Sequence, residues 1–199
     1  MSAGTKLGLI VVFGLLVVFI GIAVIYGIWL SNDIIKSDEN TKAAWSQVLN
    51  QYQRRSDLIP NLVDTVKAYA VHEKEVLTKV TEARSKVNNF VVDESLLKDP
   101  EKLQQFQKIQ GELTGALTKL MVVVENYPNL KANENFLGLQ AQLEGTENRI
   151  AVERMRFIET VNTYNKKVRI FPGSLFGYQT KPNFTAEEGT EKAPKNLFK

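Results

Sequence analysis

The sequence predicts an all-α protein in which one transmembrane helix precedes an antiparallel four-helix bundle with long helices and an extended C-terminal tail. Residues 7–30 form an apolar run without a charged side chain. Beyond them, apolar residues recur at alternating steps of three and four, the spacing that keeps one stripe against a partner helix in a coiled coil or bundle. We expect a short N-terminal segment at 1–6 and the span at 7–30. The bundle should follow at 31–172 and the tail at 173–199.

The apolar run is long enough to cross a bilayer as a helix, which takes about 20 residues. Tyr26 and Trp29 lie near its far end, where amphipathic aromatic side chains favour the headgroup zone. The alternative is a cleaved signal peptide, whose apolar region is typically about 7–15 residues long and precedes small residues. This run is longer, and residues 26–30 (YGIWL) make a poor cleavage site. We therefore expect a retained single-pass membrane anchor, with the lipid bilayer as a partner.

Small residues in the run favour close approach of a second helix in lipid, so self-association into a homo-oligomer is one hypothesis. These residues are Gly14, Gly21, Ala23 and Gly27. The orientation is weakly specified, because lysines occur on both sides of the run. A short N-terminus with one lysine favours a cytoplasmic N-terminus, which would place the bundle on the extracytoplasmic side.

The first two bundle helices are expected to meet at Pro60. The first carries an apolar face that ends near Tyr52, and it should end before Pro60 because proline disfavours helical geometry in the preceding residue. Pro60 suits the first turn of the next helix, expected over 60–90. The apolar face of the first helix comprises Ala44, Trp45, Val48, Leu49 and Tyr52.

The third and fourth helices are expected over 100–126 and 132–170. Asp99 and Pro100 are typical of a helix start, with aspartate as the cap and proline in the first turn. Phe171-Pro172-Gly173 should end the fourth helix. The tail has no helical period, and two interpretations remain open: its polarity is typical of disorder, whereas its aromatic residues favour docking on the bundle.

Composition and motifs argue against several functions. Net charge is only +3 and no basic run exceeds two residues, so a nucleic-acid partner is not expected. The absence of cysteine excludes disulfides, thiolate metal sites and cysteine nucleophiles, and leaves the redox compartment open. A di-iron bundle needs two histidines in Glu-x-x-His pairs, but His72 is alone and position 69 is tyrosine. With no motif of catalysis or phosphate binding, we expect no enzyme, catalytic residue, metal or cofactor.

A polar layer is expected inside the bundle. Glu147 and Arg154 fall on the apolar stripe of the fourth helix, and the Arg54, Arg55 and Asp57 group is expected to face them. One interpretation is a structural ion-pair layer that fixes helix register, because removing one partner of a buried pair leaves a costly lone charge. The other is a binding site for a small ligand.

Six linked motifs are spread over the chain after the apolar run: 50–63 (NQYQRRSDLIPNLV), 82–84 (EAR), 138–150 (GLQAQLEGTENRI), 162–172 (NTYNKKVRIFP), 181–184 (KPNF) and 193–195 (APK). Through these motifs the chain resembles the LemA family of bacterial membrane-anchored proteins over almost all of its length after the apolar run. One departure is the segment 173–178, which is shorter than in the family.

The resemblance implies an N-terminal membrane helix, an antiparallel helical bundle and no established enzyme activity. Family members are often described with a small extracytoplasmic N-terminus, opposite to the orientation favoured above, while others are encoded near envelope proteins. The leading hypothesis is a scaffold or adaptor that self-assembles or organises membrane or envelope proteins. The alternatives are a membrane-tethered sensor with a ligand at the polar layer and, more remotely, an enzyme without a recognised motif.

Overall fold

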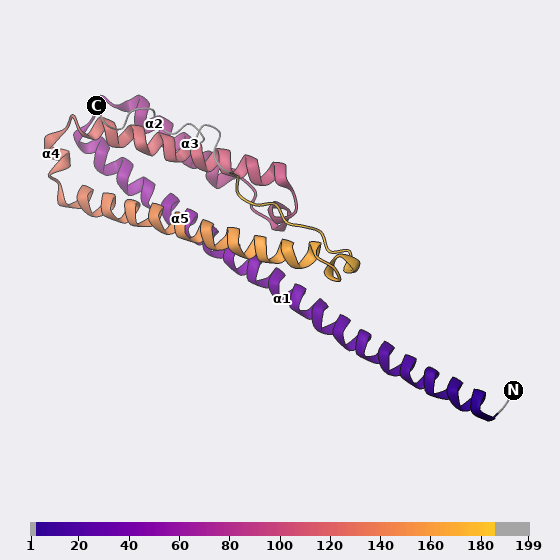
Figure 1. The fold of residues 1–199 in the computed structure, drawn as a ribbon. Helices are drawn as coiled ribbons and strands as arrows, with labels where there is room; N and C mark the ends of the chain where they lie inside the picture. The colour runs from indigo at the N-terminus through magenta and orange to yellow at the C-terminus, as the bar shows by residue number, and fades with distance from the viewer. Residues whose placement is uncertain (1–2, 186–199) are drawn as a thin grey trace, which may run out of the picture.

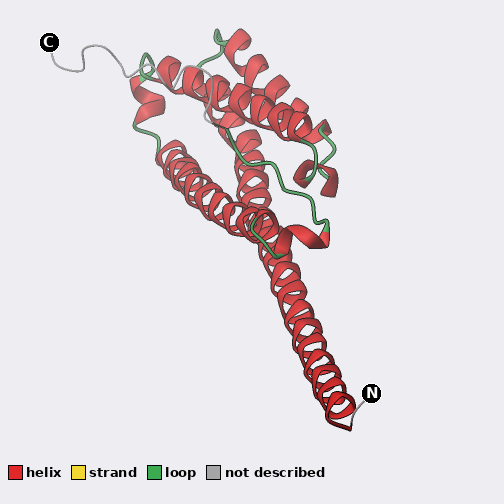
Figure 2. Cartoon of the chain, turned by 45° about the vertical axis from the view of Figure 1, so that its right-hand side comes forward, coloured by secondary structure: helices red, strands yellow, loops and turns green. Residues whose placement is uncertain are grey.

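The computed structural model describes residues 3–185, and within that range every regular element is helical (Figures 1 and 2). The all-α prediction is therefore confirmed for the described residues. Two short 3-10 turns, η1 and η2, lie between and after the helices. The elements are α1 (Ala3–Tyr69), α2 (Lys74–Asn89), η1 (Glu94–Leu97), α3 (Pro100–Val124), α4 (Pro128–Lys131), α5 (Glu134–Arg169) and η2 (Gly173–Phe176).

The C-terminal half of α1 packs along α5 in the opposite direction (Figure 1). Asn133, at the start of α5, donates a 3.0 Å hydrogen bond to the Tyr69 hydroxyl at the end of α1. At the other end of α5, Lys167 forms a 2.9 Å ion pair with Asp33. Helices α2 and α3 also run in opposite directions and pack on each other. These contacts give antiparallel pairs, and a regular four-helix bundle stays a prediction.

Three groups of buried apolar side chains follow one another along α1. The group farthest from the N-terminus joins α1 to α2, α3 and α5 around Ile59, Leu62 and Leu120. The middle group is aromatic, with the Trp45 ring 5.5 Å from Phe106 and 5.2 Å from Phe157 between ring centres. Burial of each such ring contributes about 1.5–3 kcal/mol. The smallest group forms around Ile34, Tyr164 and Val168, near the C-terminal end of α5.

Pro60 lies inside α1, so the expected helix end before Pro60 is wrong. Proline has no N–H and cannot donate to the carbonyl four residues earlier, which belongs to Ser56. In the structure that carbonyl accepts a 3.0 Å hydrogen bond from Arg84 Nε, and Ser56 Oγ donates at 2.9 Å to Asn88. Helix α2 thus supplies the donor that Pro60 lacks, and the chain turns instead at residues 70–73.

We expect Arg84→Leu to lower the free energy of unfolding by about 1–2 kcal/mol, because it leaves the half-buried Ser56 carbonyl without its donor. In a Pro60→Ala background, the alanine N–H restores the helical hydrogen bond to that carbonyl. The cost of Arg84→Leu should then shrink by about 1 kcal/mol, the coupling expected for a shared partner. Thermal unfolding of the four chains of this double-mutant cycle measures the coupling. An equal cost in both backgrounds would refute this explanation of the unbroken helix.

The N-terminal part of α1 extends alone beyond the end of α5 (Figure 2). Its apolar section has a mean hydropathy of 2.9, and none of it is buried within the protein. A helix of this length and composition is a candidate membrane anchor. No break separates it from the packed part of α1, so the anchor and the helical core share one rod.

After η2 the chain turns back and lies against α1 and α5. Asn165 holds its backbone at Lys181 through two hydrogen bonds, of 2.9 Å to the carbonyl and 2.8 Å from the N–H. Farther along, the Phe184 ring packs 5.9 Å from Trp45 and 5.4 Å from Phe157. Residues 177–185 of the tail are therefore docked, and Phe198 lies outside the described residues.

Candidate functional site

Arg55 is the central residue of a polar cluster buried between α1, α3 and α5. It lies three residues after the buried Tyr52 and four before the buried Ile59, so the helical period points it into the core. Only 1% of its side chain is exposed. A charged guanidinium at such a position must have partners, because an uncompensated buried charge is strongly destabilising.

The partners of Arg55 come from two other helices. Its NH1 group donates to Glu147 Oε1 on α5 at 2.8 Å and to Thr114 Oγ1 on α3 at 2.9 Å. Its NH2 group donates to the side-chain oxygen of Gln110 on α3. The guanidinium also lies 5.2 Å from the centre of the Tyr52 ring, in cation–π range. One side chain therefore joins α1 to both α3 and α5.

Two buried donors beside this cluster have no hydrogen-bond partner among the described residues. They are Nε of Arg55 and Nε2 of Gln107. Both residues line a cavity of about 160 Å³ that Glu147 and Arg154 also line. Buried polar groups in folded proteins nearly always have a partner, so the cavity suits a small group that accepts hydrogen bonds, such as water or a carboxylate.

The structure brings together only some of the residues expected in the polar layer. Arg55 and Glu147 form its ion pair. Arg154 lines the adjoining cavity and places its guanidinium 4.5 Å over the Phe184 ring of the tail. Arg54 and Asp57 lie outside it on the exposed face of α1, where Asp57 accepts a 2.8 Å hydrogen bond from Gln53.

Three α3 residues of the site were missed by sequence reasoning: Gln107, Gln110 and Thr114. Gln110 lies four residues after Phe106 and three before Leu113, both buried, so the helical period alone would have placed it in the core. Gln107 and Thr114 carry no comparable signal. Their role follows from the position of Arg55 opposite them.

The candidate self-association residues of the span lie in two environments. A Cβ added at Gly14 or Gly21 would meet nothing within 4 Å, and Ala23 is exposed. These three positions are open for contact with lipid or another helix. Gly27 differs, because a Cβ there would lie 4.0 Å from the Phe176 ring of η2.

The sequence model of the LemA family matches residues 44–198 of the chain, which include the polar cluster and the helices α2 to α5. The chain belongs to the LemA family. A LemA protein of Metamycoplasma hominis is 25% identical over 162 residues, which cover 80% of this chain and 69% of that protein. The magnetosome proteins MamQ 1 and MamQ 2 of Paramagnetospirillum magneticum are each 25% identical over 165 residues. Those residues cover 75% of this chain and 61% of each MamQ.

Two of the LemA-like motifs meet at the polar cluster, and two others make contacts elsewhere between elements. The first motif supplies Arg55 and Pro60, the second supplies Arg84 at the carbonyl that Pro60 leaves free, and the third supplies Glu147. A further motif supplies Asn165, which holds the tail. The resemblance of this chain to the LemA family therefore rests on residues that join helices to one another.

An ion-pair network in this LemA-family chain fastens the tail to α1. Asp38 accepts from Lys181 at 2.8 Å and from Lys42 at 3.1 Å. The Lys181 side chain is only 7% exposed, so Asp38 is its counter-ion in a nearly dry position. Partial burial raises the pKa of Asp38, but the hydrogen bonds and charges of Lys181 and Lys42 outweigh burial and hold the pKa below its usual value.

We expect acid to weaken this attachment. A carboxylate whose pKa is lowered by folding stabilises the protein above its unfolded pKa, near 3.9, and loses that contribution as pH falls toward the folded value. At pH 7, Asp38→Asn should lower the free energy of unfolding by about 1–2 kcal/mol, since Lys181 loses its counter-ion. Melting temperatures of the two chains should converge below about pH 4. The exposed Asp57→Asn is the matched control, and an Asp38→Asn deficit independent of pH would contradict the assignment.

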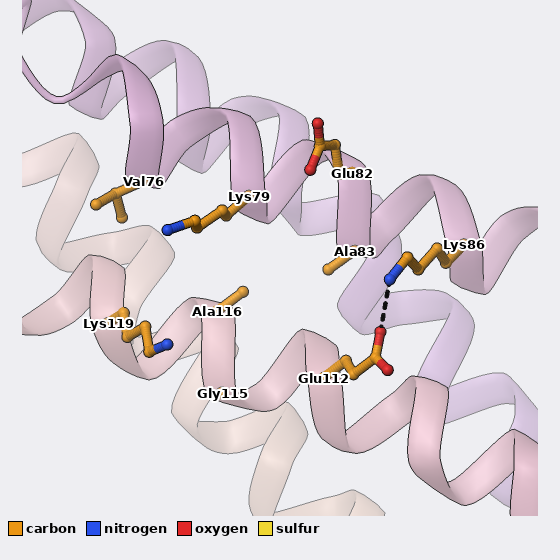
Figure 3. Close-up of a pocket in the computed structure, with 9 residues that line it drawn as sticks. All are labelled: Val76, Lys79, Glu82, Ala83, Lys86, Glu112, Gly115, Ala116 and Lys119. Atoms are coloured by element: carbon orange, nitrogen blue, oxygen red, sulfur yellow. Dashed lines mark hydrogen bonds and ion pairs between the residues drawn. The ribbon is translucent and has the colours of Figure 1, made fainter.

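A shallow groove of about 390 Å³ runs between α2 and α3. Ala83, Gly115 and Ala116 line its floor, and a Cβ added at Gly115 would meet nothing within 4 Å. Figure 3 shows Lys79 and Lys119 extending over the groove from opposite helices, while the 2.8 Å ion pair between Lys86 and Glu112 crosses it. A floor of small residues between charged rims leaves room for a polypeptide segment to pack closely.

Among the described residues, no group of three or more His, Asp or Glu side chains is placed to hold a metal ion. His72 lies exposed in the turn between α1 and α2. Of the sequence-predicted sites, the polar cluster around Arg55 is thus the one in which a buried charged side chain pairs with a charged side chain of another helix within the described residues.

Proposed function

We propose that this LemA-family chain is a non-enzymatic scaffold or adaptor, anchored by one helix in the bacterial inner (plasma) membrane. Its helical core lies on the extracytoplasmic side and self-assembles or organises membrane or envelope proteins. The observation that carries the proposal is the unbroken α1, which joins the candidate anchor to the packed helices without a hinge. Such a rod holds a binding surface at a fixed height and direction above the bilayer.

The groove between α2 and α3 is the surface proposed for partner binding. Helices α1 and α5 bury their facing surfaces against each other, and the described tail covers part of the same face. The outer faces of α2 and α3 remain open, with small residues on the groove floor. Three lysines and two glutamates lie along the rims, and the ion pair between Lys86 and Glu112 leaves two lysines against one glutamate. A partner helix with acidic flanks would match both its shape and its charge.

A substitution that adds a large, charged side chain to the groove tests this surface. Gly115→Arg fills the groove floor, and Gly138→Arg on α5 is the matched control, because a Cβ at either glycine would meet nothing within 4 Å. In gentle detergent, native membranes should yield the full-length chain in complexes much larger than its 22.4 kDa. Gly115→Arg should remove those complexes and Gly138→Arg should keep them. A chain that stays monomeric without substitution would refute the scaffold proposal.

Cysteine labelling tests the orientation. The chain has no cysteine, and Val91 is 76% exposed, so Val91→Cys adds one reactive thiol outside the core. An impermeant maleimide added to intact cells, with any outer membrane permeabilised, should label it. Labelling only after lysis would place the core in the cytoplasm and redirect the search for partners to that compartment.

The two unpartnered donors at the Arg55 cavity support a second candidate function, a membrane-tethered sensor of a small carboxylate. Arg55 Nε and Gln107 Nε2 are buried at the same cavity, and both are hydrogen-bond donors without a partner among the described residues. The neighbouring Arg154 adds a positive charge that Glu147 does not neutralise, since Glu147 pairs with Arg55. A carboxylate of formate or acetate size matches the cavity volume and this charge.

Ligand-dependent thermal stabilisation tests the sensor. Binding to the native state alone raises the free energy of unfolding by RT ln(1+[L]/Kd). Formate and acetate should therefore raise the melting temperature in a saturable way, relative to chloride at equal ionic strength. Gln107→Leu removes one of the two donors and should weaken the effect. Equal melting temperatures in all three salts would argue against a carboxylate ligand.

A further inference from the structure

The corner between α5 and the docked tail is strongly apolar and exposed. This membrane-proximal corner comprises residues 170–176, and it includes η2. Phe171 and Leu175 are each 74% exposed, Ile170 is 54% exposed and Phe176 is 40% exposed. Clusters of large exposed apolar side chains on one patch usually mark contact with another protein or with a membrane.

The position of the corner along α1 identifies its environment. The Phe176 ring lies 4.0 Å from the point where a Cβ at Gly27 would be. Gly27 belongs to the apolar run 7–30, about 4–5 Å before its end at the helical rise of 1.5 Å per residue. A side chain at that level lies at the boundary between lipid headgroups and acyl chains whenever the run spans the bilayer. Figure 1 shows this corner beside α1 where α1 continues alone.

Aromatic rings gather at the same level. On α1, Tyr26 and Trp29 stack with ring centres 6.1 Å apart, and both are exposed. In the corner, Phe176 stacks on Tyr178 at 6.3 Å. Aromatic side chains with a polar atom concentrate in the interfacial zone of membranes. Two elements distant in sequence thus contribute aromatic rings to one layer.

The corner is fixed to α1 rather than free to move away. The Tyr178 and Ser31 hydroxyls share a 3.0 Å hydrogen bond, and Lys167 pairs with Asp33 at 2.9 Å. Basic side chains complete the pattern, because Lys166 and Arg169 in the last turn of α5 are exposed just above the apolar residues. Each cation near an anionic bilayer surface adds attraction.

We propose that the membrane-proximal corner is a second membrane-binding site, which inserts Phe171 and Leu175 at the headgroup boundary of a bilayer that contains anionic lipid. It rests on the proposed membrane anchoring by α1. With α1 crossing the bilayer and the corner resting in its surface beside it, the protein has two attachment points. Two points fix the tilt of the rod and the direction in which the helical core faces.

Fluorescence quenching in reconstituted membranes tests this site. Single cysteines introduced by Leu175→Cys, Ile20→Cys and Val122→Cys carry an environment-sensitive fluorophore in the full-length protein, in nanodiscs that contain phosphatidylglycerol. Ile20 is in the apolar run, and Val122, 64% exposed on α3, is the control far from the span. Lipids with a spin label near the headgroup should quench the label at position 175 several-fold more than the label at 122. Deeper spin labels should quench the label at 20.

The outcomes separate the two proposals. Quenching at position 20 without quenching at 175 above the level at 122 overturns the corner site while the anchor stands. Absence of quenching at both 20 and 175 overturns the anchor and the corner together. Strong quenching at 175 supports the corner site, whereas crosslinking of position 175 to a partner protein without lipid quenching would assign the surface to protein and overturn it.

A charge variant tests the lipid chemistry. Lys166→Gln with Arg169→Gln removes the two exposed cations and keeps the ion pair between Lys167 and Asp33. Quenching at position 175 should fall in phosphatidylglycerol nanodiscs toward the level seen in purely zwitterionic ones. The control is the double substitution Lys74→Gln with Lys119→Gln, because both lysines are exposed and lie far from the span. Equal quenching of all chains in both lipid compositions would contradict the role of anionic lipid.

Discussion

Replacing Arg55 by methionine should lower the free energy of unfolding by about 3 kcal/mol, because the change leaves partners of a buried charge unsatisfied. Glu147 would lose its ion pair, and the side-chain oxygen of Gln110 would lose its donor. Glu147 is 36% exposed and regains some hydration, which keeps the loss at the lower end of the range for buried pairs. Thermal unfolding of the full-length chain in detergent, followed by near-ultraviolet circular dichroism, measures the effect.

The neighbouring Arg54→Met is the matched control, since Arg54 has the same side chain on the exposed face of the same helical turn. Its effect should stay within about 0.5 kcal/mol. Combining Arg55→Met with Glu147→Met should recover part of the loss, because apolar replacement of both partners removes the lone charge. Equal stability of the Arg55→Met and Arg54→Met chains would show that the polar cluster does not hold the helices in register.

Gly173→Ala should destabilise the protein by at least about 2 kcal/mol, since a methyl group forced into a packed site strains its surroundings. A Cβ at Gly173 would lie 2.0 Å from the backbone oxygen of Lys167 and 3.2 Å from its carbonyl carbon. Backbone atoms in the last turn of α5 cannot rotate away as a side chain can. The chain must therefore shift η2 away from α5, which also separates Phe176 from Gly27.

The control for this prediction is Gly138→Ala, where a Cβ meets nothing within 4 Å. On that exposed helical position alanine should raise stability by up to about 1 kcal/mol, because glycine costs helix propensity. The two glycine substitutions should thus change the melting temperature in opposite directions. If Gly173→Ala melts at or above the unsubstituted chain, the close contact between η2 and α5 is not present in solution.

The all-α fold class and several helix ends could be predicted because their causes are local. Asp99 accepts hydrogen bonds from the N–H groups of Glu101 and Lys102, as expected of a cap before proline. Helix α5 ends at Arg169, directly before the Phe171-Pro172-Gly173 stop. Caps and breakers act within a turn of the helix, so they can be identified in the sequence alone.

The continuity of α1 through Pro60 could not be predicted from local rules. The missing donor is supplied by Arg84, 28 positions along the chain, and that contact exists only after α2 folds back. The turn that actually separates α1 from α2 contains Ala70, Val71, His72 and Glu73, none of which is a helix breaker. At Pro60 a tertiary contact thus overrides the propensity of the surrounding sequence.

The candidate site was predictable in part. The helical period places Tyr52, Arg55 and Ile59 on one buried face of α1. The burial of Arg55 rather than Arg54 can therefore be predicted from the sequence. The cavity beside it could not be predicted, because it forms only when the fold brings Gln107 of α3 beside Arg55 of α1 and Arg154 of α5. The membrane-proximal corner likewise requires the fold to bring Phe176 beside Gly27.

The continuity of α1 from the candidate membrane anchor to Tyr69 underlies the proposed scaffold and the proposed membrane-proximal corner alike. Spin labels on Ile22→Cys and Arg54→Cys, both at exposed positions, measure it directly in nanodiscs by electron–electron double resonance. At 1.5 Å per residue, an unbroken helix places these positions about 48 Å apart. A single narrow distance distribution near that value is expected. A broad distribution with shorter distances would show a hinge between the anchor and the helical core, and would contradict a rod that presents the core at a fixed height.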